Sequence, residues 1–467
     1  MTDPAENISA GDLSFLDMEV LRAWVEEQRW YASKSRHVTG IELVETVVLR
    51  DESPLLFLVL LQTRFATGTH ELYQLALGVR PAEEGWSEHV VAETPEWTVY
   101  DALVDEVHGR ELLARIDRQQ PIETVEGRFD FQRANGMAGL PGDAPVRPMG
   151  VEQSNSSLVF ADELVMKVFR KLEPGTNPEL ELLAFLTAHE FPNIAPLYGA
   201  YDYEGRSLTA TLGIVQRFYP DGVGGWELAL DEMCDYPEGF LRRLATLGEV
   251  TAQMHTVLAS DASNPAFAPE EPSAEALSLL TATVDEDIER VFVRLPDDER
   301  VAPIAGSAQD VRERLGALAQ LGVGGKVIRI HGDYHLGQTL HTPGGWVILD
   351  FEGEPARPLP ERRQKRSPLR DVAGMLRSFA YVTSASEIMR GREAPDDFEQ
   401  RAREIFLERY LATIDPSLLP SGEAALRHLL SVFELEKAVY ELRYELDNRP
   451  DWVPIPVAGI LRLLEES

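Results

Sequence analysis

The sequence predicts a mixed α/β protein of two or three packed units, and three observations carry that prediction. A chain of 467 residues is long for a single hydrophobic core. Its first part is rich in β-branched and aliphatic runs, whereas helical periodicity dominates beyond Asp202. Between these parts, two short strand-like runs lead into a helix start. We therefore expect subdomains over residues 1–90, 91–213 and 214–467.

The first subdomain is expected to combine one helix with three strands. The helix is predicted over Phe15–Gln28, and strands over Ile41–Leu49, Leu55–Leu61 and Glu71–Val79. Asp51–Pro54 supplies turn residues between the first two strands. These elements predict a small β-rich unit at the N-terminal side.

The second subdomain shows the pattern strand, strand, helix. After the polar stretch Arg80–Glu96, Ser157–Phe160 and Leu164–Phe169 read as a hairpin. Asn177 followed by Pro178 is a typical helix start. This order suits a small lobe that surrounds a nucleotide.

The third subdomain is predicted to be mainly helical. Short β-like runs at Val327–Ile330 and Trp346–Leu349 flank a polar loop. The helices are expected over Leu241–Leu258, Leu369–Tyr381, Phe398–Thr413, Ala424–Asn448 and Pro456–Leu464.

Charge and cysteine content narrow the function classes. The net charge of −34 argues against nucleic acid and anionic membranes as partners. The longest strongly apolar stretch, Leu55–Leu61, is far too short to span a bilayer, and the first residues do not form a secretory signal. Cys234 is the single cysteine, so no intrachain disulfide is possible. We expect a cytoplasmic location.

The segment from His331 to Gln338, followed by Asp350, is the strongest chemical signal in the chain. Asp333 stands near the start of a polar loop, Gln338 follows five residues later, and Asp350 ends the next strand-like run. A carboxylate can take a hydroxyl proton, and two oxygen-bearing side chains suit Mg²⁺. This set favours phosphoryl transfer over two unrelated acids buried in turns.

Polar residues before the predicted hairpin are candidates for nucleotide binding. Their backbone and hydroxyl groups suit phosphate oxygens, although an ordinary β-turn is the alternative; the candidates are Gln153, Ser154, Asn155, Ser156 and Ser157. Lys167 is a lone charge in an apolar strand, so it points either to phosphates or to solvent. Its carboxylate partner is predicted to be Glu181 rather than Glu179, with solvated helix acids as the alternative.

The motif His331-Gly332-Asp333, with Asp350-Phe351-Glu352, resembles the signature of aminoglycoside phosphotransferases and related small-molecule kinases. The resemblance implies ATP and Mg²⁺ as cofactors, Asp333 as catalytic base, and Gln338 and Asp350 as metal ligands. Gln338 stands where most of that class has Asn. The resemblance further places His331 and Asp371 in support of the loop, and Val215 and Gln216 beside adenine. Asp371 could instead only stabilise its helix terminus.

Further segments resemble maltokinases over essentially the whole chain. They are Arg29–Arg36, Glu152–Ser157, Lys167–Arg170, Pro174–Pro178, Asp350–Pro355, Arg362–Met375 and Leu435–Glu441. The resemblance implies a bilobal, protein-kinase-like α/β fold with an extra N-terminal cap. It also implies phosphorylation of maltose at the anomeric hydroxyl, giving α-maltose 1-phosphate for α-glucan and glycogen synthesis. Trehalose synthase is a possible partner.

One face of the predicted helix near residue 440 is the candidate sugar site. Polar and aromatic side chains recur there at helical spacing, and His335 lies near the base; the helix residues are Glu436, Lys437, Tyr440, Glu441 and Tyr444. A solvated helix with two buried tyrosines is the alternative. The rival functions are a kinase for glucosamine or an aminoglycoside, and a catalytically inactive scaffold for trehalose synthase.

Overall fold

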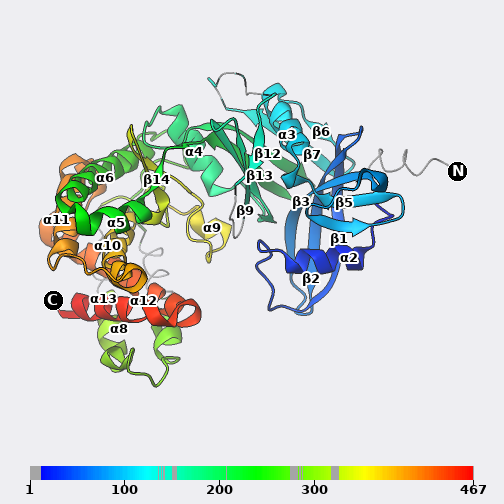
Figure 1. Ribbon diagram of the computed structural model, residues 1–467. Coiled ribbons are helices and arrows are strands. Elements are labelled where there is room, and N and C mark those ends of the chain that lie inside the picture. Colours follow the sequence, from blue (N-terminus) through cyan, green and yellow to red (C-terminus); the bar gives the residue numbers. More distant parts are fainter. Residues whose placement is uncertain are drawn as a thin grey trace. The chain divides into compact units, whose positions relative to one another are not determined.

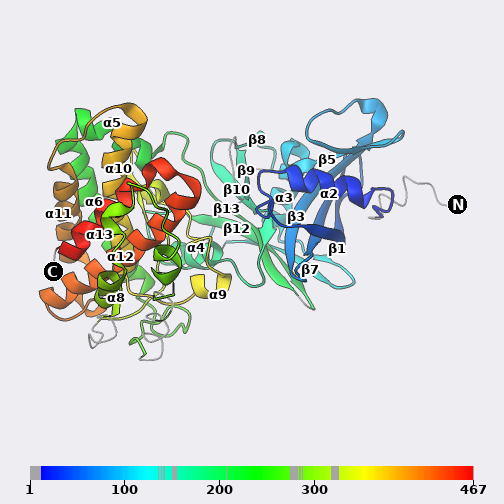
Figure 2. The same ribbon diagram turned by 90° about the horizontal axis from the view of Figure 1, so that it is seen from below.

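The computed structural model forms two compact units, shown in Figures 1 and 2. The first unit holds Met1–Ala188 and Ala195–Pro220, and the second holds His189–Ile194 and Asp221–Ser467. The structure describes residues 12–134, 136–137, 139, 142–149, 155–206, 208–273, 282, 285–286, 288–316 and 325–465. Among these residues, none of the helices combines the length and apolar character that crossing a membrane requires.

An antiparallel sheet with one helix packed on it forms the N-terminal part of the first unit. The strand order is β1-β2-β3-β5-β4, and β11 (Lys171–Leu172) pairs with β3. The elements are α2 (Met18–Glu27), β1 (Val38–Arg50), β2 (Leu55–Phe65), β3 (His70–Pro81), β4 (Val90–Glu93) and β5 (Trp97–Asp101). The boundary predicted at residue 90 therefore falls inside this sheet, because the polar stretch after Arg80 returns as β4.

The apolar run that begins at Leu55 is buried because both faces of β2 are covered. Phe57, Val59 and Leu61 belong to the same core cluster as Leu21 and Val25 of α2. The alternate residues of the apolar run, Leu56, Leu58 and Leu60, are also buried. Continuous apolar character is typical of a strand covered on both faces.

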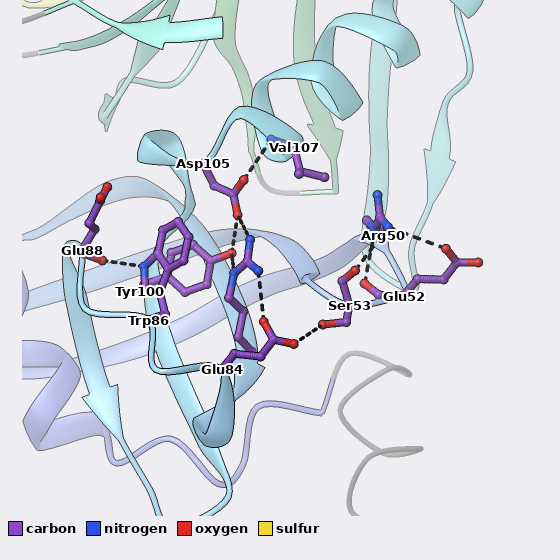
Figure 3. Close-up of polar contacts among 10 residues, drawn as sticks. Arg50, Glu52, Ser53, Glu84, Trp86, Glu88, Tyr100, Asp105 and Val107 are labelled. Carbon is purple, nitrogen blue, oxygen red and sulfur yellow. Dashed lines mark hydrogen bonds and ion pairs between the residues drawn. The ribbon is translucent and has the colours of Figure 1, made fainter. Parts of the chain in front are cut away.

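Arg80, at the end of β3, is the centre of a polar cluster beside this sheet. Figure 3 labels its partners Glu84, Tyr100 and Asp105. Its guanidinium donates to Asp105 at 2.7 Å, to Glu84 at 3.1 Å and to the Tyr100 hydroxyl at 3.1 Å. The Tyr100 hydroxyl also donates to Asp105 at 2.6 Å. Asp105 in turn accepts from the backbone N–H of Val107 and so caps helix α3 (Glu106–Arg118). The cluster thus ties the cap sheet to the helix that follows it.

The rest of the first unit is a seven-stranded antiparallel sheet in the order β6-β7-β12-β13-β10-β9-β8. Its strands are β6 (Ile122–Glu123), β7 (Gly127–Arg133), β8 (Val146–Pro148), β9 (Asn155–Phe160), β10 (Leu164–Phe169), β12 (Leu197–Gly205) and β13 (Thr209–Arg217). The predicted hairpin is β9–β10. Helix α4 (Pro178–Ala188) starts where expected, because the Asn177 side chain accepts from the N–H of Glu179 at 2.8 Å. The boundary predicted after residue 213 lies inside β13.

The second unit is mainly helical, with a small sheet of β14 (Val223–Gly224), β15 (Thr339–Thr342) and β16 (Gly345–Ile348). Val327–Ile330, predicted as a strand, forms only isolated bridges, to Glu270 and Arg366. The main helices are α5 (Gly225–Asp235), α6 (Pro237–Leu258), α8 (Ala308–Gly316), α9 (Leu359–Arg362), α10 (Leu369–Arg390), α11 (Phe398–Thr413), α12 (Glu423–Asn448) and α13 (Pro454–Glu465). Helix α10 packs against α12, and this pair carries most of the site described next.

The Arg80 cluster leads to a stability prediction. Arg80→Met leaves the buried Asp105 carboxylate without its cation, so the free energy of unfolding of the first unit should fall by about 3 kcal/mol. Urea unfolding followed by tryptophan fluorescence measures this loss. Arg64→Met is the matched control, because Arg64 pairs with Glu42 on the surface of the same sheet and should cost less than about 1 kcal/mol. Equal losses in the two variants would contradict the role given to the cluster.

Candidate active site

The loop around Asp333 is held in place by one buried carboxylate. Asp371, in the first turn of α10, accepts hydrogen bonds from the backbone N–H groups of His331 at 2.8 Å and Gly332 at 2.9 Å. His255 of α6 contacts the same carboxylate at 3.0 Å, and Tyr410 of α11 contacts the other ring nitrogen at 3.0 Å. Burial alone would raise the pKa of Asp371, but these partners hold its pKa below the ordinary value. Asp371 therefore fixes the loop as a charged acceptor.

His331 and Gly374 set the close packing beneath this loop. The imidazole of His331 meets the carbonyl oxygen of Leu349 at 2.8 Å and packs against the ring of Phe351. It thus ties the Asp333 loop to the segment that carries Asp350. Gly374 of α10 lies so close to the loop that an added Cβ would stand 2.6 Å from the Tyr334 carbonyl oxygen. A side chain at position 374 is incompatible with this contact.

Asp333 is half-buried, and neighbouring basic side chains favour its ionised form. Lys437 of α12 donates to its carboxylate at 3.2 Å, and the His335 imidazole lies 3.9 Å from the other oxygen. Burial raises the pKa of Asp333, but Lys437 and His335 outweigh it, so its pKa is lowered overall. Lys437 itself is desolvated, and Asp333 and Glu354 nevertheless raise its pKa. Asp333 is therefore ionised at neutral pH, as a base requires.

Gln338 and Asp350 lie together at the opposite end of the loop. The Gln338 side-chain amide donates to Asp350 at 2.9 Å, and the backbone N–H of Leu349 donates to the Gln338 carbonyl at 2.9 Å. Asp350 has a positive φ of 61°, a backbone conformation that residues other than glycine rarely adopt. A carboxylate oxygen of Glu352 also lies within 4.8 Å of one of Asp350. This set of hard oxygen ligands fits Mg²⁺, and sequence reasoning had not included Glu352 in it.

Lys167 pairs with Glu179, and the prediction of Glu181 needs correction. The Lys167 ammonium lies 2.8 Å from the Glu179 carboxylate, whose side chain is 1% exposed. The Asn177 cap places Glu179 in the first turn of α4, where it is buried, whereas Glu181 is partly exposed. Two residues along a helix correspond to a rotation of roughly 200°, so only one of the two acids can face Lys167.

The other predicted nucleotide contacts are spread over neighbouring strands of the first unit. Gln153 and Ser154 lie outside the described residues. Asn155, Ser156 and Ser157 begin β9, and the Ser156 hydroxyl accepts from Arg170 at 2.8 Å. Val215 and Gln216 lie near the end of β13, between β10 and β12. Nucleotide contacts at these positions stay predictions.

A cavity of about 730 Å³ in the second unit is lined by Asp333 and the predicted sugar face of α12. It includes Lys437, Tyr440, Glu441 and Tyr444, which share one face of the helix, together with His335. Glu436 does not line it: this residue pairs with Arg370 at 2.7 Å and lines an adjoining, smaller cavity. One residue along a helix corresponds to a rotation of about 100°, which accounts for the difference.

Several residues of this site were missed by sequence reasoning. Trp226 and Tyr381 contribute aromatic surface to the larger cavity, and Arg377 fixes Glu441 through two contacts at 2.7 and 3.0 Å. His255 of α6 is fully buried and contacts Asp371. These side chains come from elements that are far apart in the sequence. Local spacing therefore does not predict that they belong to one site.

Two protein families match the chain. Residues 24–105 match the maltokinase N-terminal cap domain, and residues 145–353 match the phosphotransferase enzyme family. The second match covers both Lys167 and the loop from His331 to Asp350. By these matches the chain resembles a phosphotransferase-type kinase with a maltokinase-type cap. The predicted membership of the aminoglycoside-phosphotransferase-like superfamily is thereby confirmed, whereas maltokinase itself is not singled out.

Relatives of this kinase carry the name glucosamine kinase. The kinase is 26% identical over 358 residues to that of Streptacidiphilus jiangxiensis, covering 73% of this chain and 78% of the relative. It is 27% identical over 336 residues to that of Mycolicibacterium smegmatis, covering 69% and 80%. A solved glucosamine kinase in complex with glucosamine, ADP and inorganic phosphate aligns with a TM-score of 0.71, 20% identity and 99% coverage of both chains. The predicted kinase-like α/β fold with an added cap is confirmed.

The carboxylate of Asp371 leads to a prediction for the kinase loop. Asp371→Asn removes the charge and turns one acceptor into a donor, so at least one loop N–H loses its partner. Amide exchange in the segment around Gly332 should accelerate about tenfold or more. Hydrogen-exchange mass spectrometry measures this, with the cap sheet of the first unit as internal control. Unchanged protection of the loop would show that Asp371 does not hold it.

Proposed function

We propose that this kinase transfers the γ-phosphoryl group of ATP to a sugar hydroxyl, with Asp333 as the base, and that the sugar is maltose. The product would be α-maltose 1-phosphate, formed at the anomeric hydroxyl. The observation that carries the proposal is the shared lining of one large cavity by an ionised Asp333 and a polar, aromatic helix face. Volumes of roughly 300–1,000 Å³ are typical of small-molecule sites, so the cavity suits a disaccharide.

Asp333 is the group that would accept the proton of the attacking hydroxyl. Its lowered pKa keeps it ionised, and its lining of the cavity gives it access to an acceptor. Lys437 holds the carboxylate from one side, so the second oxygen remains for the hydroxyl. Phosphoryl transfer depends mainly on such positioning and on charge stabilisation.

The nucleotide would be held by Lys167 and by residues of the segment that ends at Glu352. Both belong to the range that matches the phosphotransferase family. Lys167, fixed by Glu179, is the candidate for the α- and β-phosphates. Gln338 and Asp350 are the candidate ligands of Mg²⁺, which would neutralise charge on the phosphates. Glu352 adds a third oxygen donor beside Asp350.

The charges that line the cavity favour a neutral sugar over an amine-rich acceptor. Glu441 forms an ion pair with Arg377. Glu445 forms an ion pair with Arg449, which donates to it at 2.7 and 2.9 Å. An acceptor with several amines would gain most from carboxylates without cations of their own. Trp226, Tyr444 and Trp452 provide the flat apolar faces on which sugar C–H groups pack. The maltokinase-type cap supports the same choice.

Glucosamine is the second candidate acceptor. It is supported by the names of the two relatives at 26% and 27% identity. Its single amine could be bound by Asp447, which also lines the cavity. Our preference for maltose rests on the cavity size and on the paired state of Glu441 and Glu445.

A maltose phosphate would have a defined place in carbohydrate metabolism. Transfer of its maltosyl unit to α-glucan would connect the kinase to glycogen synthesis, as the resemblance to maltokinases implies. Trehalose synthase, which can supply maltose, is proposed as a partner on the same ground.

A panel of acceptors tests the proposal directly. The purified kinase should convert maltose with Mg-ATP into a new phosphate ester that phosphorus NMR identifies as a 1-phosphate. Glucosamine, glucose and an aminoglycoside serve as competing acceptors under the same conditions. A kcat/KM for glucosamine above that for maltose would replace maltose by the second candidate. Absence of any ester would overturn the proposed activity.

Removal of the base should abolish turnover without removing the acceptor site. Asp333→Asn should lower kcat by about a hundredfold or more, with the affinity for ADP changed little. Steady-state kinetics and calorimetric titration of ADP measure the two effects. Asp447→Asn is the matched control, because it removes a carboxylate that lines the same cavity and should keep kcat within a few-fold. Near-normal turnover of Asp333→Asn would contradict the assigned role.

A further inference from the structure

A second, smaller cavity of about 100 Å³ opens beside Asp333 in the second unit. It shares Asp333, Gly374, Lys437 and Tyr440 with the larger cavity but extends to the segment between Gly353 and Arg370. Its walls carry several arginines, an unusual feature in a chain with a net charge of −34. Nothing in the proposed transfer reaction uses these arginines.

Most charges in this cavity are paired with one another. Arg370 pairs with Glu436 at 2.7 Å, and Arg357 lies 3.5 Å from Glu361 and also contacts Glu354. Lys437 pairs with Asp333. The carboxylate of Asp371 is occupied by the loop N–H groups and His255. The acidic groups of the cavity are therefore already engaged.

Arg366 differs from these paired side chains of the cavity, because it has no carboxylate partner among the described residues. Its guanidinium donates to the side-chain carbonyl of Gln364 at 2.5 Å, and no carboxylate of a described residue lies within the 4.0 Å of an ion pair. Its backbone is fixed by two hydrogen bonds with Ile328, at 2.8 and 2.9 Å. The guanidinium is half-buried and lines the cavity. A held, partly desolvated cation without an anion is costly.

The surroundings of Arg366 favour an incoming anion. Burial and the neighbouring Arg370 and Arg357 lower the pKa of Arg366 to about 10, so its positive charge is destabilised where it stands. Helix α10 begins at Leu369, and the positive end of its dipole lies close in sequence to these arginines. Arginine guanidinium groups match the oxygens of a phosphate through paired N–H donors.

We propose that this cavity is a binding site for a phosphate group, held by Arg366 with Arg357 and Arg370 beside it. The phosphate comes either from inorganic phosphate or from a phosphate ester of the sugar. Because the two cavities meet at Asp333, Lys437 and Tyr440, a sugar phosphate can place its ring in the larger cavity and its phosphate beside Arg366. That second source rests on the proposed function, whereas the phosphate site itself does not.

Calorimetric titration with inorganic phosphate tests the site at constant ionic strength and with MgADP present. The wild-type protein should bind phosphate, and Arg366→Gln should weaken this binding at least tenfold. Arg427→Gln is the matched control, because it removes the same charge from an exposed position on α12 and should change the affinity less than twofold. Equal phosphate affinity in Arg366→Gln and wild type, or no binding to wild type, overturns the proposal.

Further measurements separate the two phosphate sources and guard against misfolding. Arg366→Gln removes a cation without a carboxylate partner, so its Tm should equal or exceed that of the wild type. α-Maltose 1-phosphate and maltose are titrated into both proteins. When inorganic phosphate binding is weakened in Arg366→Gln, an equal loss for the ester with unchanged maltose affinity identifies the sugar ester as a ligand of the site. A loss for inorganic phosphate without a loss for the ester identifies the free anion. If neither sugar ligand binds but phosphate binding still depends on Arg366, the site stands and the choice of maltose fails.

Discussion

The buried carboxylate of Asp371 is the constraint on which the rest of the catalytic region depends. It gathers two loop N–H groups and an imidazole around one charge, and so links α6, α10 and the loop that carries Asp333. Removing such a charge from water is expensive, and only a full set of donors compensates for it. The position of Asp333 is therefore fixed by groups that never contact a substrate. The same loop is tied to the segment that carries Asp350 by the contact between His331 and the Leu349 carbonyl, which links the proposed base to the proposed metal ligands.

Sequence reasoning predicted the catalytic region where chemistry and local spacing coincide. The loop from His331 to Gln338 and the acid at 350 are close in sequence, so their approach in space follows from two turns and a short hairpin. The helix cap at Asn177 and the hairpin of β9 and β10 were likewise predictable from local residue preferences. The strand predicted at Val327–Ile330 was not formed as an element, because its partners, Glu270 and Arg366, offer only single bridges.

The remaining features depend on tertiary packing that a single sequence does not disclose. The choice between Glu179 and Glu181 turns on which face of α4 meets the sheet, and the apolar pattern of that helix is nearly uniform. The polar segment after Arg80 returns as strand β4, which pairs with β5, and its local spacing gives no such signal. Trp226 and Tyr381 reach one cavity from two separate helices. Periodicity identifies faces of helices, but it does not identify what each face meets.

Gly459 of α13 shows how a residue outside the acceptor cavity shapes it. A Cβ at this position would stand 2.1 Å from the guanidinium of Arg377, so the absence of a side chain is what admits the arginine. Arg377 is almost completely buried and grips Glu441 on the cavity wall. The position of Glu441 on the cavity wall thus depends on a missing methyl group on a separate helix, α13. Drift in substrate preference during evolution has a route through position 459 that leaves every cavity-lining residue unchanged.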